Sequence, residues 1–133
     1  MVSSSHYIMP RAEFDQKPTL LIVISPYYKD IADNLLYGAQ SEIEAVGGMH
    51  ETVQVPGALE IPTAICIAER MSSFDGYVAL GCVIRGETSH YETVCHDSSR
   101  ALQLLGLQGL CIGNGILTVE TQKQAEARAD TKD

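Results

Sequence analysis

The stretch R-G-E-T-S-H, from Arg85 to His90, follows an apolar run and brings together side chains that could do chemistry. Ser89 is followed three residues later by Glu92, which is the spacing of a capping box, so the pattern predicts that a helix begins here. Free backbone N–H groups from Gly86 to Ser89 and the helix dipole would then form an anion site suited to a phosphate. A well-capped helix without a ligand would have the same sequence, and the motif alone does not decide between the two.

His90 falls in the first turn of this predicted helix. The positive end of the helix dipole disfavours a charged imidazole, so the neutral ring is able to accept a proton. A neutral base beside a phosphate suits proton transfer coupled to phosphate departure, although a lone His is more often structural. His96 lies six residues further on, near the opposite face of the helix, and is expected at the surface.

Two other short stretches hold chemically useful side chains. Glu60 stands in V-P-G-A-L-E-I-P, where Pro56 and Pro62 stiffen the chain around it. Its carboxylate could accept hydrogen bonds from sugar or polyol hydroxyls, or it could stabilise a helix start through the dipole. Tyr27 and Tyr28 could offer a flat face to a heterocycle, or they could cap a strand against the next helix.

A second capping-box spacing, Thr121 with Gln124, predicts another helix start. Arg128 lies seven residues beyond Thr121 on the same helix face, near the helix end, where a cation is also favourable by itself.

The elements that must position these residues alternate along the chain. Apolar runs predict strands at 19–25, 50–56, 74–84 and 109–118, and helical periodicity predicts helices at 29–46, 59–71, 89–107 and 120–130. This order predicts an α/β fold, a three-layer α-β-α sandwich with a four-stranded parallel sheet of flavodoxin-like type. Ligands bind at the carboxyl ends of such strands, in the loops that begin at Ser25, Val55, Arg85 and Asn114.

Length and composition limit the function classes. A chain of 133 residues predicts one domain, 18–133, behind a loose polar tail, 1–17. A net charge of −8 argues against nucleic acid or an anionic membrane as a partner. The sequence shows no signal-peptide pattern and no apolar run of membrane-spanning length.

The cysteines form no C-x-x-C pair and predict neither a zinc site nor a disulfide framework, which favours a reducing cytoplasm. They are Cys66, Cys82, Cys95 and Cys111.

Several motifs together are specific to one family. They are L-L-Y-G-A, V-P-G-A-L-E-I-P, A-L-G-C-V-I-R-G-E-T-S-H-Y-E, G-N-G-I-L-T-V-E and Q-A-E-A-R-A-D. In their order and spacing the chain resembles the 6,7-dimethyl-8-ribityllumazine synthases of riboflavin biosynthesis, from about residue 19 to residue 130. The resemblance implies a transferase that condenses 5-amino-6-(D-ribitylamino)uracil with 3,4-dihydroxy-2-butanone 4-phosphate. The lumazine, phosphate and water are released, without metal or organic cofactor.

The resemblance also implies roles for individual residues. His90 matches the proton-transfer histidine, Tyr27 the aromatic that stacks on the pyrimidine, and Glu60 the carboxylate that bonds the ribityl hydroxyls. The remaining substrate-binding positions fall into three sets, which line the ring and ribityl pocket, hold the phosphate, or reach in from the neighbouring subunit. These sets are Ala58, Leu59, Cys82, Val83 and Ile84; then Glu87 and Thr88; then Asn114 and Arg128.

The family acts as an assembly, commonly a pentamer, with sites shared between neighbouring subunits. Asn114 departs from the phenylalanine of many members, and Tyr28 from the usual asparagine. Residues 130–133 also depart from the Gly-rich turn typical of shell-forming members, and the sequence stops where the family usually continues into a last helix, which a truncation would also explain. We expect a pentamer or a dimer of pentamers rather than a shell. Three alternatives remain open: a flavin- or lumazine-binding protein without catalysis, a riboflavin synthase of the archaeal type, and an electron-transfer flavodoxin-like module.

Overall fold

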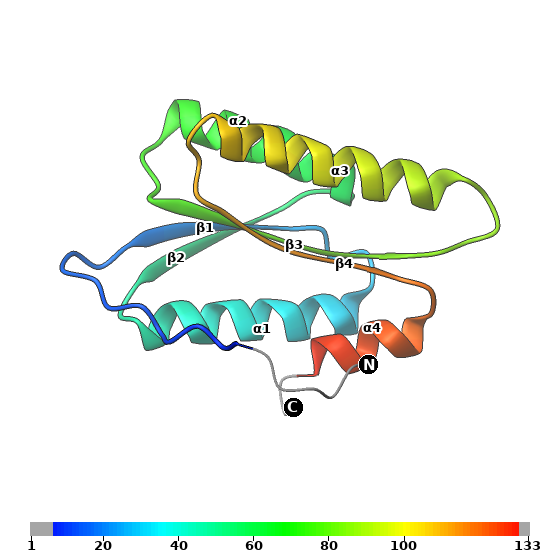
Figure 1. Cartoon of the computed structure of the whole chain (residues 1–133), viewed down its shortest axis with the longest axis horizontal. Coiled ribbons are helices and arrows are strands. Elements are labelled where there is room, and N and C mark those ends of the chain that lie inside the picture. The colour runs from blue at the N-terminus through cyan, green and yellow to red at the C-terminus, as the bar shows by residue number, and fades with distance from the viewer. Residues whose placement is uncertain (1–6, 131–133) are drawn as a thin grey trace.

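A computed structural model describes residues 7–130 of the chain. Four strands and four α-helices alternate in it (Figure 1), with one short 3₁₀ turn, η1, before the second helix. The elements are β1 (Thr19–Ile24), α1 (Lys29–Ala45), β2 (Met49–Gln54), η1 (Ala58–Glu60), α2 (Ile61–Met71), β3 (Gly76–Ile84), α3 (His90–Leu107), β4 (Ile112–Val119) and α4 (Gln122–Ala129).

The four strands form one parallel sheet in the order β2-β1-β3-β4. Helices α2 and α3 cover one face of the sheet, and α1 and α4 cover the other (Figure 1). The predicted three-layer α/β fold is confirmed. Because every strand is joined to the next by a helix, all four strands run the same way and their carboxyl ends share one edge of the sheet.

Side chains of the central strands alternate between the two helix layers, as the period of a strand requires. Val23 and Ala79 pack with Ile61 and Ile65 of α2 on one face of the sheet. On the other face, Ile22 of β1 is completely buried and packs with α1. Both faces of β1 are therefore buried, which explains why its sequence, T-L-L-I-V-I, is a continuous apolar run.

The predicted element boundaries differ from the observed ones by up to three residues, and the largest difference is the start of β4, which was expected at residue 109 and lies at Ile112. The second helix was expected from residue 59, but α2 begins at Ile61, with Pro62 in its first turn, where a missing N–H costs nothing. A loop was expected to begin at Asn114, but this residue lies within β4, opposite Ala79 of β3. The strand predicted at 109–118 already contained Asn114, and β4 runs through this position to Val119.

The segment before β1 contains neither helix nor strand in residues 7–18. It lies beside α1, where Arg11 makes a two-pronged ion pair with Glu42, at 2.7 Å from Nε and 3.1 Å from Nη2. The first six residues of the predicted tail lie outside the described residues, and the boundary between tail and domain remains a prediction.

Candidate active site

One cleft lies where β1, β2 and β3 end, and most of the predicted site residues line it. Its volume is about 410 Å³. The predicted residues that it brings together are Tyr27, Ala58, Leu59, Glu60, Cys82, Val83, Ile84 and His90. They come from the loop after β1, from η1, from the end of β3 and from the start of α3, so the topology alone assembles them.

The two tyrosines after β1 have different environments. Tyr28 packs against a cluster that includes Ile31, Val119 and Ala125, between the sheet and α4, and burial raises its pKa. Tyr27 is 77% exposed, and its ring meets that of Tyr28 edge to face at 5.0 Å. Tyr28 therefore caps the strand against the helices, while Tyr27 leaves a ring face at the cleft open to a planar ligand.

The 3₁₀ turn η1 presents Glu60 at the rim of the cleft. Gly57 begins the turn in an extended conformation, and its carbonyl accepts a hydrogen bond from the Glu60 N–H at 3.1 Å. Ala58 is buried, which fixes the turn against the protein, and the side chains of Leu59 and Glu60 remain exposed. Glu60 Oε1 lies 3.0 Å from the position that a Cβ on Gly57 would take, so the glycine leaves room for the carboxylate.

The end of β3 supplies unpaired backbone to the cleft. Pairing of β3 with β1 stops where Ile24 meets Leu80, whereas pairing with β4 continues to Ile84 opposite Val119. From Cys82 to Ile84, the edge of β3 that faces away from β4 has no neighbouring strand in the described sheet. Backbone groups on this edge are available to hydrogen-bond a polar ring.

Cys82 is one of the residues that line the cleft, its side chain packs against the cluster that includes Val119 and Ala125, and burial raises the pKa of its thiol. A raised pKa reduces the fraction of thiolate, which is the nucleophilic form of cysteine. Cys82 is therefore placed to contribute backbone and packing to the cleft rather than nucleophilic chemistry.

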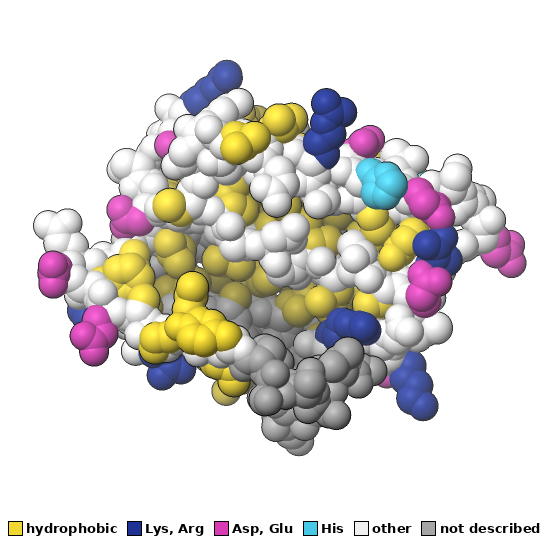
Figure 2. Space-filling model, in the orientation of Figure 1, with side chains coloured by type: hydrophobic (Ala, Val, Ile, Leu, Met, Phe, Trp, Pro, Cys, Tyr) yellow, Lys and Arg dark blue, Asp and Glu magenta, His cyan; other side chains and the backbone are white. Residues whose placement is uncertain are grey.

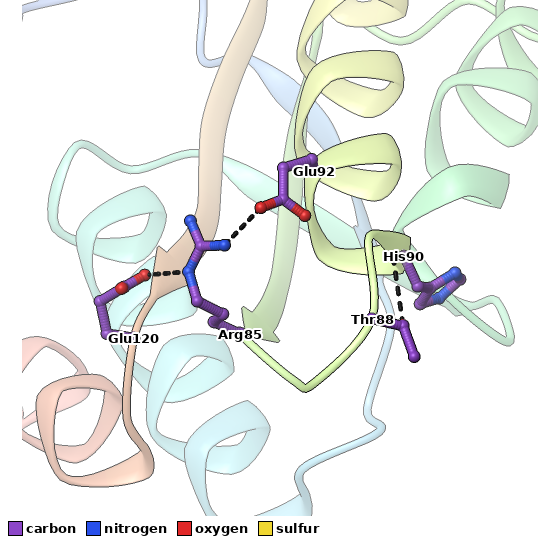
Figure 3. A network of polar contacts seen from close by, with 5 residues as sticks. All are labelled: Arg85, Thr88, His90, Glu92 and Glu120. Carbon is purple, nitrogen blue, oxygen red and sulfur yellow. Dashed lines mark hydrogen bonds and ion pairs between the residues drawn. The ribbon is translucent and has the colours of Figure 1, made fainter.

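The capping box predicted at the start of α3 is wrong. Ser89 occupies the N-cap position, but its side chain makes no capping hydrogen bond. Glu92 turns instead to Arg85 (Figure 3), whose Nη1 pairs with Glu92 Oε1 and whose Nε donates to Glu120 Oε2 at 2.7 Å. A guanidinium with two carboxylates within reach competes successfully for Glu92, because a charge-assisted bond is stronger than a bond to a neutral backbone N–H.

His90 is the first residue of α3, and it is exposed at the cleft. Its backbone N–H donates to Thr88 Oγ1 at 3.3 Å (Figure 3), so Thr88 satisfies one of the free amides of the helix start. The Thr88 hydroxyl accepts this bond and still has its own hydrogen to donate. Thr88 and the preceding Glu87 are exposed in the loop that leads into His90, and their role in phosphate binding stays a prediction.

Four of the predicted site residues do not line the cleft: Glu87 and Thr88 lie in the loop before His90, and Asn114 and Arg128 lie on other elements. Asn114 faces a separate hollow between α3 and β4, and its Oδ1 accepts a hydrogen bond from the Ile116 N–H at 2.9 Å. Arg128 lies on α4, across the sheet from α3, where its Nη1 donates to the Gln124 carbonyl at 3.3 Å. Neither residue lines the cleft that contains His90.

The capping of α4 is confirmed. Thr121 Oγ1 accepts a hydrogen bond from the Gln124 N–H at 3.2 Å, and the Gln124 side chain reaches back to the Glu120 N–H at 2.8 Å. The returning bond therefore goes to the residue before the N-cap rather than to Thr121 itself.

Comparison with known proteins identifies the family. The profile of the 6,7-dimethyl-8-ribityllumazine synthases matches residues 17–133. The chain belongs to the 6,7-dimethyl-8-ribityllumazine synthase family. A protein of this name from Jannaschia sp. (strain CCS1) is 62% identical over 117 residues, which cover 88% of this chain and 66% of that protein.

Two more relatives carry the same name. The protein from Sphingopyxis alaskensis is 56% identical over 84% of this chain and 79% of its own length. The protein from Bartonella tribocorum is 54% identical over 91% of this chain and 82% of its own length. The chain thus spans about two thirds to four fifths of these lumazine synthases.

The cleft of this family member also contains residues that the motifs did not single out. Ser25 is buried, and its hydroxyl donates to the Pro56 carbonyl at 3.3 Å, which ties together the loops after β1 and β2. Val94, on the second turn of α3, adds an apolar wall. Ser25 and Pro56 each follow the end of a strand, and that position was the available signal.

None of the helices within residues 7–130 has the length and apolar character needed to cross a membrane. In the same part of the chain, no three His, Cys, Asp or Glu side chains gather in a way that would hold a metal ion. All four cysteines are free thiols.

Proposed function

We propose that the protein condenses 5-amino-6-(D-ribitylamino)uracil with 3,4-dihydroxy-2-butanone 4-phosphate to 6,7-dimethyl-8-ribityllumazine. The observation that carries this proposal is the meeting of Tyr27, Glu60, the free edge of β3 and His90 in one cleft. Membership of the lumazine synthase family supports the reaction class. The cleft is large enough for a small polar ring with its side chain, at about 410 Å³.

The pyrimidine substrate is proposed to lie against the end of β3. Tyr27 offers its exposed ring for stacking, and the backbone of residues 82–84 offers donors and acceptors to the carbonyl and N–H groups of the uracil. Glu60 at the rim accepts hydrogen bonds from the ribityl hydroxyls, with Ala58 and Leu59 beside it. This arrangement leaves the 5-amino group of the uracil directed toward the start of α3.

The butanone phosphate is proposed to lie at the start of α3. This helix is 18 residues long, so its dipole and first-turn amides favour an anion. The Thr88 hydroxyl adds a donor, and Glu87 contributes its backbone to the same loop. His90 then stands between the phosphate and the 5-amino group, where a ring nitrogen can carry a proton from one to the other.

The reaction proceeds in three proposed stages. The 5-amino group condenses with the ketone to an imine and loses water, phosphate is then eliminated, and ring closure with a further loss of water completes the lumazine. Each stage needs reactants held close together and protons moved, rather than a covalent enzyme intermediate. The cleft fits this requirement, since it contains one histidine, and the cysteine in it has a raised pKa.

We further propose a homo-oligomer, a pentamer or a dimer of pentamers, in which Asn114 and Arg128 serve the cleft of a neighbouring subunit. Their distance from the cleft of their own chain supports this. Figure 2 shows apolar side chains across the sheet layer of one face, between charged side chains at the rim, a distribution typical of a contact surface. Residues 131–133, on which the preference over a shell partly depends, lie outside the described residues.

We place the protein in the cytoplasm, because its thiols are free.

The proposal is tested by incubating the purified protein with both substrates and recording the absorbance and fluorescence of the lumazine. Light scattering on the same sample gives the size of the assembly. A folded pentamer that forms no lumazine would refute the proposed reaction. Tight flavin binding without turnover would instead support a lumazine- or flavin-binding protein, and turnover of lumazine alone would support a riboflavin synthase.

A further inference from the structure

Arg85 links three elements around the start of α3 without entering the cleft. It is the first residue after β3, and its backbone N–H donates to the Val119 carbonyl at the end of β4, at 2.9 Å. Its Nε donates to Glu120 Oε2 at 2.7 Å, its Nη1 pairs with Glu92 Oε1, and its guanidinium carbon lies 4.4 Å from the centre of the Tyr91 ring. Figure 3 shows the side chain turned away from His90 and Thr88, which lie on the other side of the loop.

The loop between Arg85 and α3 has little support of its own. Residues 86–90 are exposed, and no atom outside the adjacent residues lies within 4 Å of the position that a Cβ on Gly86 would take. Ser89 does not cap the helix with its side chain. The position of the loop therefore depends on the contacts at its two ends. Arg85 is the first end, and its side chain also contacts the second end, the first turn of α3, through Glu92 and Tyr91.

The partner on the other side of Arg85 is itself fixed. The Glu120 N–H donates to the Gln124 side chain at 2.8 Å, as part of the capping of α4. Arg85 thus ties the start of α3 to the start of another helix rather than to a free segment. An arginine is suited to this link, because its planar fork bonds two carboxylates at once, whereas a lysine is a single point charge.

We propose that Arg85 is a positioning residue that holds the β3–α3 loop, and with it Thr88 and His90, in the orientation that the reaction uses. The expected effect of Arg85 on kinetics rests on the proposed function, whereas its expected effect on the order of the β3–α3 loop does not. Arg85 touches no part of the cleft, so its effect on substrate passes through the loop.

The structural consequence is measured by amide hydrogen exchange of peptides covering the start of α3, on the assembled protein. Arg85→Ala removes the link and is expected to speed exchange in this segment about threefold to tenfold, since two exposed ion pairs and a cation–π contact are lost. Arg11→Ala is the matched control, because it also breaks a two-pronged surface ion pair, far from the loop. Equal exchange at the start of α3 in Arg85→Ala and in the unmodified protein would overturn the proposal.

The catalytic consequence is measured by steady-state kinetics with each substrate varied in turn. Arg85→Ala is expected to lower kcat and raise the KM for the butanone phosphate about fivefold to tenfold, with little change in the KM for the uracil substrate. Arg85→Lys, which keeps one ion pair, should have kcat and KM values between those of the unmodified protein and those of Arg85→Ala. Adding Glu92→Gln to Arg85→Ala should change these values little further. Equal rises in both KM values would indicate general loosening and overturn the specific role.

The two measurements separate the proposals. If the unmodified protein forms no lumazine, the proposed function fails, while the exchange data still decide whether Arg85 holds the loop. If it turns over and Arg85→Ala matches it in both KM values and kcat, the positioning role fails and the proposed function stands.

Discussion

Removing the carboxylate of Glu60 is the sharpest test of how the ribityl chain binds. Within residues 7–130 this carboxylate is exposed at the end of η1 and makes no ion pair with another side chain, so Glu60→Ala leaves no buried group unpaired. The fold should lose little stability. A hydrogen bond to a charged group contributes about 1.5–3 kcal/mol. At about 1.4 kcal/mol for each factor of ten, the KM for the uracil substrate should rise roughly 10- to 100-fold.

Smaller changes at the same place should give graded results. Glu60→Gln keeps an acceptor but loses the charge, and should raise the same KM about fivefold. Gly57→Ala keeps the charge but puts a methyl group 3.0 Å from Glu60 Oε1, so the carboxylate must shift by a few tenths of an ångström. It should also raise the KM for the uracil substrate, by less than Glu60→Ala.

The assay varies one substrate at a time and follows lumazine formation by absorbance. Glu51→Gln is the matched control, because it removes one exposed carboxylate from β2, outside the cleft. It should leave both KM values unchanged. The reasoning is refuted if Glu60→Ala leaves the KM for the uracil substrate within twofold of the unmodified protein, or if it raises the KM for the butanone phosphate by the same factor.

Three further predictions concern catalysis and stability. His90→Ala should lower kcat about 10- to 1000-fold at unchanged assembly size, and an unchanged kcat would return His90 to a structural role. Ile65→Ala, at a fully buried position, should lower the free energy of unfolding by about 2–5 kcal/mol and Ile65→Val by about 0.5–1.5 kcal/mol, in urea titrations at one protein concentration. Burial and the 2.6 Å hydrogen bond to Glu69 raise the pKa of Tyr77, so its contribution to stability is complete below the ordinary tyrosine value of about 10 and is lost as pH rises above it. The Tyr77→Phe variant should have a lower free energy of unfolding than the unmodified protein at pH 7. The difference between the two should become smaller above pH 10, and a difference that does not change with pH would contradict the raised pKa of Tyr77.

The main features of the fold could be predicted because local patterns and tertiary packing agree. The apolar run of β1 indicated burial on both faces, and the structure has helices on both. The capping box at Ser89 failed because the four-residue motif does not take account of Arg85, which lies seven residues before Glu92 and pairs with its carboxylate. Glu120 lies 28 positions beyond Glu92 in sequence, yet both carboxylates bond the Arg85 guanidinium.

The cleft itself shows why its residue list was easier to predict than its geometry. Each loop could be found from the end of an apolar run, but the space between the loops depends on where the pairing of strands stops. β3 pairs with β4 as far as Ile84, but it pairs with β1 only as far as Leu80. The unpaired edge of β3 at Cys82 to Ile84 follows from this register, which the side-chain pattern does not encode, because both faces of β3 are apolar. The proposed recognition of the pyrimidine by backbone groups therefore depends on a difference in strand pairing, and shortening the β3–β4 pairing would remove it even with every side chain of the cleft retained.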